Sequence, residues 1–330
     1  MIFSFTAVPG FDFLTHFAAH IQAEVEHDLM LMPKSLGEGY IRKLTFSPDF
    51  KITIHHYVLK EDLIINRNAS SDGLELTTIF FYNNEQSLEI AFKNKAQIRF
   101  SERDESAVQV TSNDLSSTIR FPAQHKIHYV VVAITPSFLK SLLALRTPNS
   151  VLQTMILGGN SFLYFERMTV EIRRLLGHMA EVNLTDDLNH FFMQVKVQEL
   201  LYLLFQKLSA RENTEHQSVT SADAERLLNI RSEVIRDLSV PPVLKNMAQR
   251  AAMSETKLKL LFKQTFGSSI YNYYQQARMD EAAFLLKQGK QSVAEVGYML
   301  GFTNLSHFSR LFEKHYGLNP KKFSRTSGSV

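Results

Sequence analysis

The sequence contains no cysteine, and it holds only 13 glycines and 9 prolines in 330 residues. Without cysteine, a disulfide framework, a zinc–thiolate site and a cysteine nucleophile are excluded, and a cytoplasmic location is expected. The low glycine and proline content excludes collagen-like and low-complexity chains. The longest apolar runs, Tyr129–Ile134 and Leu200–Phe205, are far shorter than the ~18 residues of a membrane span. No membrane partner is therefore expected. The first ten residues lack Lys and Arg, so a secretory signal is not expected either.

Catalytic motifs are absent as well. The chain has no G-x-G-x-x-G, G-x-S-x-G or G-x-x-x-x-G-K-[ST] pattern. His55, His56 and Glu61 invite comparison with a metal-dependent cupin enzyme. Neighbouring residues of a strand point to opposite faces, however, so His55 and His56 cannot both face one barrel interior. Neither a metal, another cofactor nor a catalytic residue is therefore predicted.

Charge is distributed unevenly along the chain. The net charge is +3, but residues 221–330 carry 16 Lys and Arg against 9 Asp and Glu. The first 220 residues carry 20 against 24, which is a net negative charge. A basic final third favours an anionic partner for that part of the chain.

Short runs rich in β-branched and aromatic residues occupy positions 39–132, for example KITIHHYV and ELTTIFFYN. Turn clusters such as SPD (47–49) and SND (112–114) separate them. This pattern predicts an antiparallel sandwich or barrel of about eight strands. A helix capped by Asp12 is expected before it, because Leu14, Phe17 and Ile21 recur at helical spacing.

Helical patterns follow the strands. Pro136 suits the first turn of a helix over 137–145, and residues 147–161 are expected to form a loop. Two further helices are predicted over 165–182 and 187–208. The second has a wide apolar face, with Leu188, Phe191, Val195, Tyr202 and Phe205 on one stripe and Phe192, Leu200, Leu204 and Leu208 close beside it. We expect part of that face to pack on the β-domain and the rest to pair with a second copy. Charged replacements of Leu201 and Phe205, or of Leu188 and Phe192, are then expected to separate the subunits.

The segment 210–220, ARENTEHQSVT, has almost no apolar content and predicts a linker. The expected organisation is therefore a β-rich domain over 1–150, a helical dimerisation segment over 151–210, a linker over 211–224 and a helical domain over 225–330. The fold class is α+β.

Two segments of the last hundred residues resemble each other, VLKNMAQRAAMSETKLKLLFKQTFGSS (243–269) and SVAEVGYMLGFTNLSHFSRLFEKHYGLNP (292–320). Each predicts a short helix, a turn and a second helix that ends at a glycine, Gly267 or Gly317. A longer helix over 269–288 connects them. Two helix-turn-helix units in a basic region predict that each second helix enters a DNA major groove, about one duplex turn apart.

This C-terminal region resembles the AraC/XylS family of bacterial transcription regulators over about residues 228–326. The stretch GYMLGFTNLSHFSRLFEKHYGLNPKKFSR (297–325) follows the family signature most closely. The β-rich region is also similar to the cupin-type effector and dimerisation domain of many members, although only in the order and length of its elements. The resemblance implies an α-helical DNA-binding domain and a cupin-like sensor.

Residue roles follow from the resemblance by position. The implied DNA-binding residues are Thr256, Lys257, Lys259, Leu260, Lys263, Asn304, Leu305, Ser306, His307, Ser309 and Arg310. Arg310 is expected to pair with guanine, and Asn304 or Ser306 could equally hold phosphate and set the register. Leu260 stands where the family usually has Arg, Leu305 replaces a polar residue, Glu313 replaces Lys, and Ala252 replaces a turn glycine. Base preference is therefore expected to differ from the family norm.

The expected function is that of a sequence-specific transcription regulator controlled by a small molecule in the N-terminal domain. Its expected partners are double-stranded DNA, an unidentified effector and a second subunit, and RNA polymerase is a further candidate. Candidate effector-binding residues are Arg42, His55, His56, Tyr57, Arg67 and Tyr82. Two alternatives stay open: a metal-dependent cupin enzyme with a DNA-binding appendage, and an effector-independent DNA binder.

Overall fold

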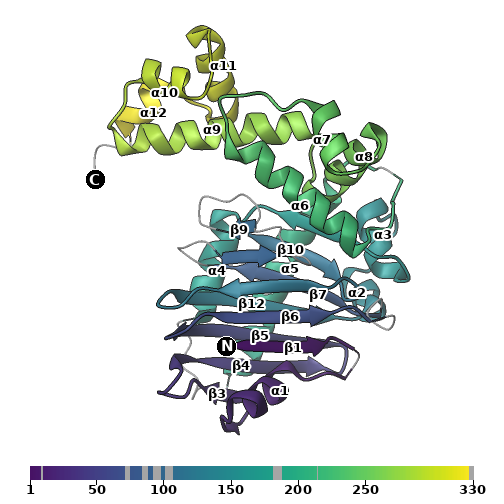
Figure 1. Ribbon diagram of the computed structural model, residues 1–330. Helices are drawn as coiled ribbons and strands as arrows, with labels where there is room; N and C mark the ends of the chain where they lie inside the picture. Colours follow the sequence, from purple (N-terminus) through teal and green to yellow (C-terminus); the bar gives the residue numbers. More distant parts are fainter. Residues whose placement is uncertain are drawn as a thin grey trace. The chain divides into compact units, whose positions relative to one another are not determined.

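The computed structural model describes residues 1–8, 10–70, 75–83, 88–91, 98–100, 107–180, 188–213 and 215–326. The chain divides into two compact units, Met1–Arg226 and Leu227–Val330. The first contains both sheets and the second is helical, so the predicted α+β class with a β-rich N-terminal and an α-helical C-terminal part is confirmed (Figure 1). Among the described residues no helix is long and apolar enough to cross a membrane.

Two sheets form the first unit. The smaller has the order β1-β6-β11-β8-β9 and the larger β13-β10-β7-β12-β5-β4-β3-β2. Their bounds are β1 Ile2–Thr6, β2 Val25–Glu26, β3 Leu29–Leu31, β4 Gly37–Ser47, β5 Phe50–Leu59, β6 Leu63–Asn68, β7 Thr77–Tyr82, β8 Leu88–Ala91, β9 Ile98–Phe100, β10 Val108–Ser112, β11 Ser117–Phe121, β12 Lys126–Ile134 and β13 Leu163–Glu166. The described strands exceed the predicted eight, and β1 pairs with β6 in parallel rather than antiparallel fashion.

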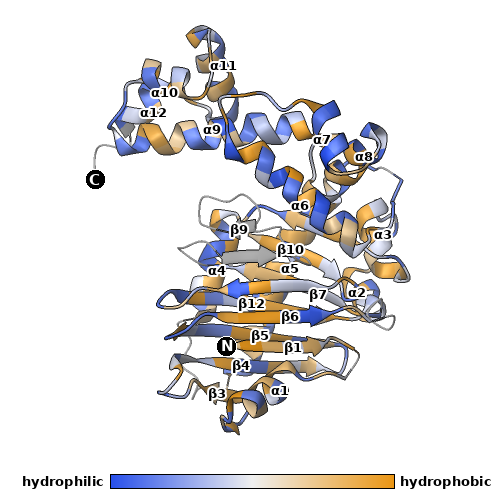
Figure 2. Ribbon diagram, viewed as in Figure 1, coloured by the Kyte–Doolittle hydropathy of each residue, from blue (hydrophilic) through white to orange (hydrophobic). Residues whose placement is uncertain are grey.

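Four helices pack against one face of the larger sheet: α2 (Pro136–Leu143), α3 (Ser150–Leu157), α4 (Val170–Ala180) and α5 (Asn189–Ser209). Successive side chains of β12 point to opposite faces of the larger sheet. Val130, Val132 and Ile134 join the core under the helices, while Val131 and Ala133 face the opposite side. Hydrophobic residues predominate along β6 and β1 of the smaller sheet and along β5 of the larger sheet, as Figure 2 shows.

Local caps form where the sequence predicts them. Asp12 Oδ1 accepts hydrogen bonds from the backbone of Leu14 and Thr15 at the start of α1 (Phe13–Ile21). Pro136 occupies the first turn of α2. The predicted loop at 147–161 is wrong, because α3 lies there with Asn149 as its N-cap. The helix predicted from residue 165 is also wrong at its start, where β13 pairs with β10 before α4 begins.

The face of α5 divides differently from the prediction. Leu201 and Phe205 are buried in the core beneath the helix, so charged replacements there would disrupt folding rather than pairing. Four predicted stripe residues are exposed, at 68% for Leu188, 65% for Phe191, 43% for Val195 and 62% for Tyr202. Phe192 is half-buried against the core, so of the second pair of replacements only Leu188 lies on the exposed stripe.

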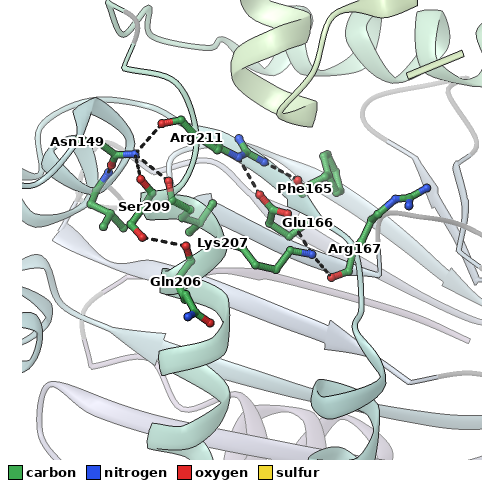
Figure 3. A network of polar contacts seen from close by, with 10 residues as sticks. Asn149, Phe165, Glu166, Arg167, Gln206, Lys207, Ser209 and Arg211 are labelled. Atoms are coloured by element: carbon green, nitrogen blue, oxygen red, sulfur yellow. Dashed lines mark hydrogen bonds and ion pairs between the residues drawn. The ribbon is translucent and has the colours of Figure 1, made fainter. Parts of the chain in front are cut away.

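The segment 210–220 has no regular secondary structure in its described residues, but it belongs to the first unit and contacts that unit's strands and helices. Arg211 Nε lies 2.8 Å from Glu166 Oε1, and Asn149 Nδ2 donates to the carbonyls of Leu208 and Arg211 (Figure 3). Val219 is fully buried and its N–H donates to the Ser161 carbonyl. These contacts anchor the segment in spite of its polar composition.

The second unit begins within α6 (Ser221–Arg236) and continues with α7 Leu244–Arg250, α8 Glu255–Phe266, α9 Ile270–Gln288, α10 Val293–Met299, α11 Leu305–Tyr316 and α12 Pro320–Thr326. Gly267 and Gly317 end α8 and α11 with φ of 74° and 71°, as the sequence predicts. In Figure 1, α9 runs along this unit with α7 and α8 at one end and α10, α11 and α12 at the other.

Candidate DNA-binding surface and ligand cavity

The first helix-turn-helix consists of α7 and α8. Ser254 caps α8 by accepting a hydrogen bond from the Lys257 N–H at 3.1 Å. Leu258, Leu261 and Phe262 are buried beneath the helix. The predicted contact residues lie on its other side: Thr256, Lys257 and Lys259 are exposed, and Leu260 and Lys263 are half-buried.

The second helix-turn-helix consists of α10 and α11. Phe308 and Phe312 are buried, while Asn304, Ser306, His307 and Arg310 are exposed and Leu305 and Ser309 are half-buried. Asn304 Oδ1 accepts from the N–H groups of Ser306 and His307 at 3.0 Å each, so this oxygen caps α11.

Leu305, where the family usually has a polar residue, packs inside the second helix-turn-helix. A Cβ placed on Gly297 would lie 2.6 Å from Leu305 Cδ2, so α10 and α11 approach closely at this point. The leucine therefore contributes to the helix–helix contact. Leu260, the other apolar replacement, is half-buried on α8, and Glu313 is exposed on α11.

Arg278 of α9 holds the second turn in place. Its guanidinium is buried, donates from Nε and Nη2 to the Leu300 carbonyl at 3.1 and 2.6 Å, and stacks 3.6 Å above the Phe302 ring. Those bonds satisfy the carbonyl at the end of α10. Sequence reasoning missed this residue, since an arginine within a basic region is expected to be exposed.

The connecting helix α9 separates the two helix-turn-helix motifs within the second unit. Its 19 residues correspond to a length of roughly 28 Å at 1.5 Å per residue. One turn of B-DNA rises about 34 Å. A rigid helix of this length suits two readers placed on successive turns of one duplex face.

A cavity of about 160 Å³ lies between the two sheets of the first unit. Both sheets line it, with Phe5 and Ala7 near β1, Ile65 and Arg67 on β6, Ser117 and Ile119 on β11, Lys43 and Thr45 on β4, Lys51, Thr53 and His55 on β5, Thr78 and Phe80 on β7, and Tyr129, Val131 and Ala133 on β12. Phe11, Asp12 and Phe13 complete it at the start of α1, together with Val8, Ile52, Leu76 and Asn113.

The cavity contains buried polar groups. Arg67 Nη1 donates to Asn113 Oδ1 at 2.9 Å, and Thr78 Oγ1 donates to the same oxygen at 2.5 Å. His55 Nε2 lies 2.9 Å from Thr53 Oγ1, and its ring stacks on Tyr129 with centroids 4.0 Å apart. Burial lowers the pKa of His55 to about 3, with His128 adding to the effect, so the imidazole is neutral at pH 7.

Of the six candidate effector residues, the structure brings His55 and Arg67 together in this cavity. The other four do not line it. Tyr57 and Tyr82 are buried elsewhere in the sandwich, and His56 points away from His55, with its ring 5.5 Å from that of His128. Arg42 lies next to Asn189 of α5. Asn113, Thr53 and Thr78 were missed, although the period-2 alternation from His55 would have indicated Thr53.

Metal ligands do not gather in the described parts of the chain. No group of three or more His, Asp and Glu side chains there is placed to hold an ion. The cavity thus offers donors, one neutral imidazole and apolar walls rather than a coordination sphere.

Family comparisons agree with both halves of this description. A helix-turn-helix domain model matches residues 247–326, and the model of the regulatory protein PchR N-terminal domain matches residues 37–221, more than half of the chain. The chain belongs to the AraC/XylS family. The resemblance to this family of transcriptional regulators, predicted from the sequence, is confirmed.

Similar curated AraC/XylS-type proteins match over part of their length. An uncharacterized HTH-type transcriptional regulator of Haemophilus influenzae is 28% identical over 130 residues, 38% of this chain and 42% of that protein. The HTH-type transcriptional activator CfaD of Escherichia coli is 27% identical over 157 residues, 47% of this chain and 56% of that protein. The chain thus spans about half the length of the curated relatives it matches.

Among solved structures, an apo ToxT variant from Vibrio cholerae aligns with 84% of this chain and 97% of that one, at 16% identity and a TM-score of 0.34. An AraC-type regulator from Chromobacterium violaceum aligns with 33% of this chain and 97% of that one, at 25% identity and a TM-score of 0.31.

Proposed function

We propose that this chain is a sequence-specific transcription regulator that binds double-stranded DNA through α8 and α11. The observation that carries the proposal is the pair of helix-turn-helix units joined by α9. Each buries its aromatic and aliphatic residues and leaves polar residues exposed along the second helix. Exposed Lys259 and Arg310 supply the charge that phosphates and guanine edges attract.

A small molecule in the cavity of the first unit controls this binding. Asn113 lines the cavity, and the residues that follow it make a set of contacts leading to the start of α6. Asp114 accepts a hydrogen bond from Ser161, whose carbonyl accepts from Val219 N–H. The Ser116 N–H donates to Ser221 Oγ, in the first residue of α6. A ligand that moves Asn113 would therefore act on the helix from which the second unit continues.

Two copies pair through the exposed stripe of α5. Phe191, Val195 and Tyr202 recur at helical spacing over three turns and expose much of their apolar surface. A helix that is apolar on two sides needs a second surface to bury the side that its own domain leaves exposed, and a second copy of the chain offers an identical stripe. A dimer holds two pairs of DNA readers and raises their effective concentration at adjacent sites.

Selection of bound duplexes from a random pool by the full-length chain tests the DNA-binding proposal. Two short motifs with centres about one helical turn apart are expected. Arg310→Ala is expected to lose the base preference at one position of the motif, a loss of about 1–3 kcal/mol of discrimination between bases. Arg146→Ala, which removes an exposed arginine of the first unit, is the matched control and leaves the motif unchanged.

Two results would count against these roles. A uniform loss of affinity in Arg310→Ala on all sequences would make this residue a phosphate contact. Failure to enrich any motif would remove sequence-specific binding altogether.

A further inference from the structure

The guanidinium of Arg67 has an edge without a hydrogen-bond partner. Arg67 is 4% exposed and lines the cavity from β6. Its Nη1 donates to Asn113, but Nε and Nη2 make no hydrogen bond. Burial lowers the pKa of Arg67 to about 10, which leaves the group protonated at pH 7. A buried cation therefore presents two parallel N–H donors, the geometry that carboxylates accept in bidentate fashion.

Asn113 adds a third donor at the same place. It is fully buried, and its Oδ1 already accepts from Arg67 and Thr78. Its Nδ2 has no hydrogen-bond partner. The groups left over beside the guanidinium are thus N–H donors, so an ionised carboxylate, which only accepts, would satisfy them.

Two acidic residues lie close enough to matter here, and neither is hydrogen-bonded to Arg67. Asp12, which lines the cavity, lies 2.6 Å from Lys43 Nζ and caps α1. Asp114 accepts a hydrogen bond from Ser161 through Oδ2, its buried Oδ1 has no hydrogen-bond partner, and its charge acts on Arg67 only electrostatically. In the described residues, the charge of Arg67 is therefore not matched by a hydrogen-bonded carboxylate of the chain, which is unusual for a buried ion.

The rest of the cavity is apolar and rich in aromatic rings. Phe5 and Phe11 stack in parallel with centroids 4.8 Å apart, and Phe13, Phe80, Ile119 and Val131 form further parts of the wall. Such walls favour a hydrophobic ligand body.

We infer that the cavity binds a monocarboxylate with a compact apolar body. The carboxylate oxygens bind the Nε–Nη2 edge of Arg67 and Nδ2 of Asn113, and the body packs among Phe5, Phe11 and Phe80. This inference deepens the proposed function, since it names the chemical class of the effector. It depends on that function only for its regulatory meaning.

Calorimetric titration of the full-length chain with benzoate, cyclohexanecarboxylate and octanoate tests the inference, with the three corresponding primary amides as uncharged controls. At least one acid is expected to bind and to raise the unfolding temperature, while its amide binds at least about tenfold more weakly. The inference is overturned if none of the acids binds, or if the amide binds as tightly as the acid. This comparison requires no substitution in the buried site.

Variants then locate the carboxylate. Arg67→Lys keeps a cation but loses the two parallel N–H donors of the guanidinium. The affinity for the acid is expected to fall at least about tenfold. Arg120→Lys is the matched control, because Arg120 lies on β11 outside the cavity and pairs with Asp62 on the surface. Equal binding by wild type and Arg67→Lys would place the ligand elsewhere. DNA selection in the absence of any acid distinguishes failure of this inference from failure of the proposed function.

Discussion

At the scale of single residues, Ala252 is strained. Its φ is +47°, a left-handed conformation that costs an L residue roughly 1 kcal/mol, whereas the corresponding turn of the second helix-turn-helix has Gly301 at φ +77°. Ala252→Gly is therefore expected to raise the free energy of unfolding by up to about 1 kcal/mol, measured by urea denaturation followed by circular dichroism.

Gly301→Ala is the opposite test at the matching turn. Its Cβ would lie 2.1 Å from the Ser239 carbonyl oxygen, in addition to the φ strain, so a larger destabilisation is expected. Equal stability of both variants and the wild type would show that turn strain does not limit this domain.

His55 predicts an acid sensitivity of the first unit. Its pKa is about 3 in the folded chain against 6.5 in the unfolded chain, so only the unfolded chain takes up a proton between these values. Stability is therefore highest above about pH 6.5 and falls by about 1.4 kcal/mol per pH unit below it. Between pH 7 and 5, the free energy of unfolding measured by calorimetry is expected to fall less steeply in His55→Gln than in the wild type. His178→Gln, at an exposed histidine of α4, should retain the wild-type slope.

At the scale of elements, α5 can be tested directly. Phe191→Glu with Tyr202→Glu places two charges on the exposed stripe and is expected to convert a dimer to monomers without lowering the unfolding temperature. Light scattering measures the mass. Leu157→Glu with Val170→Glu, at two exposed apolar residues of α3 and α4, is the matched control. A wild-type chain that is already monomeric, or an unchanged mass in the variant, would contradict pairing through α5.

The elements that the sequence predicts well are those set by local chemistry. Asp12, Pro136, Gly267 and Gly317 mark helix ends because a cap acts within three or four residues. The start of the 165–182 segment is a strand because Phe165 pairs with Gln109, more than fifty residues earlier. Periodicity within one segment contains no information about such a partner.

The cavity, too, depends on contacts between segments far apart in the sequence. His55 and Arg67 could be proposed as polar residues on predicted strands, but their meeting depends on how two sheets pack. Asn113 follows β10, lies 46 residues from Arg67 and looks like an ordinary turn residue in the sequence. Only the assembled sandwich gives it a role beside the guanidinium.

At the scale of the whole molecule, coupling between ligand and DNA is expected to depend on Ser221. Ser221→Ala removes the side chain that accepts from Ser116 N–H and leaves the cavity and the recognition helices intact. Ligand and DNA should each bind this variant with wild-type affinity, while the effect of a bound carboxylate on DNA affinity shrinks. Fluorescence anisotropy with and without the acid measures both, and linkage requires a reciprocal change in ligand affinity. Unchanged coupling would exclude this contact from the signal.

Under the proposed function, α9 fixes two DNA readers of one chain at a single spacing. The most direct measurement is the affinity of the full-length chain for its selected duplex and for duplexes with 5 or 10 base pairs inserted between the two motifs. Since α9 is a continuous helix of 19 residues, both insertions are expected to weaken binding by at least about tenfold, because only one reader of the pair can engage. Affinity that tolerates either insertion would contradict a rigid pair of readers.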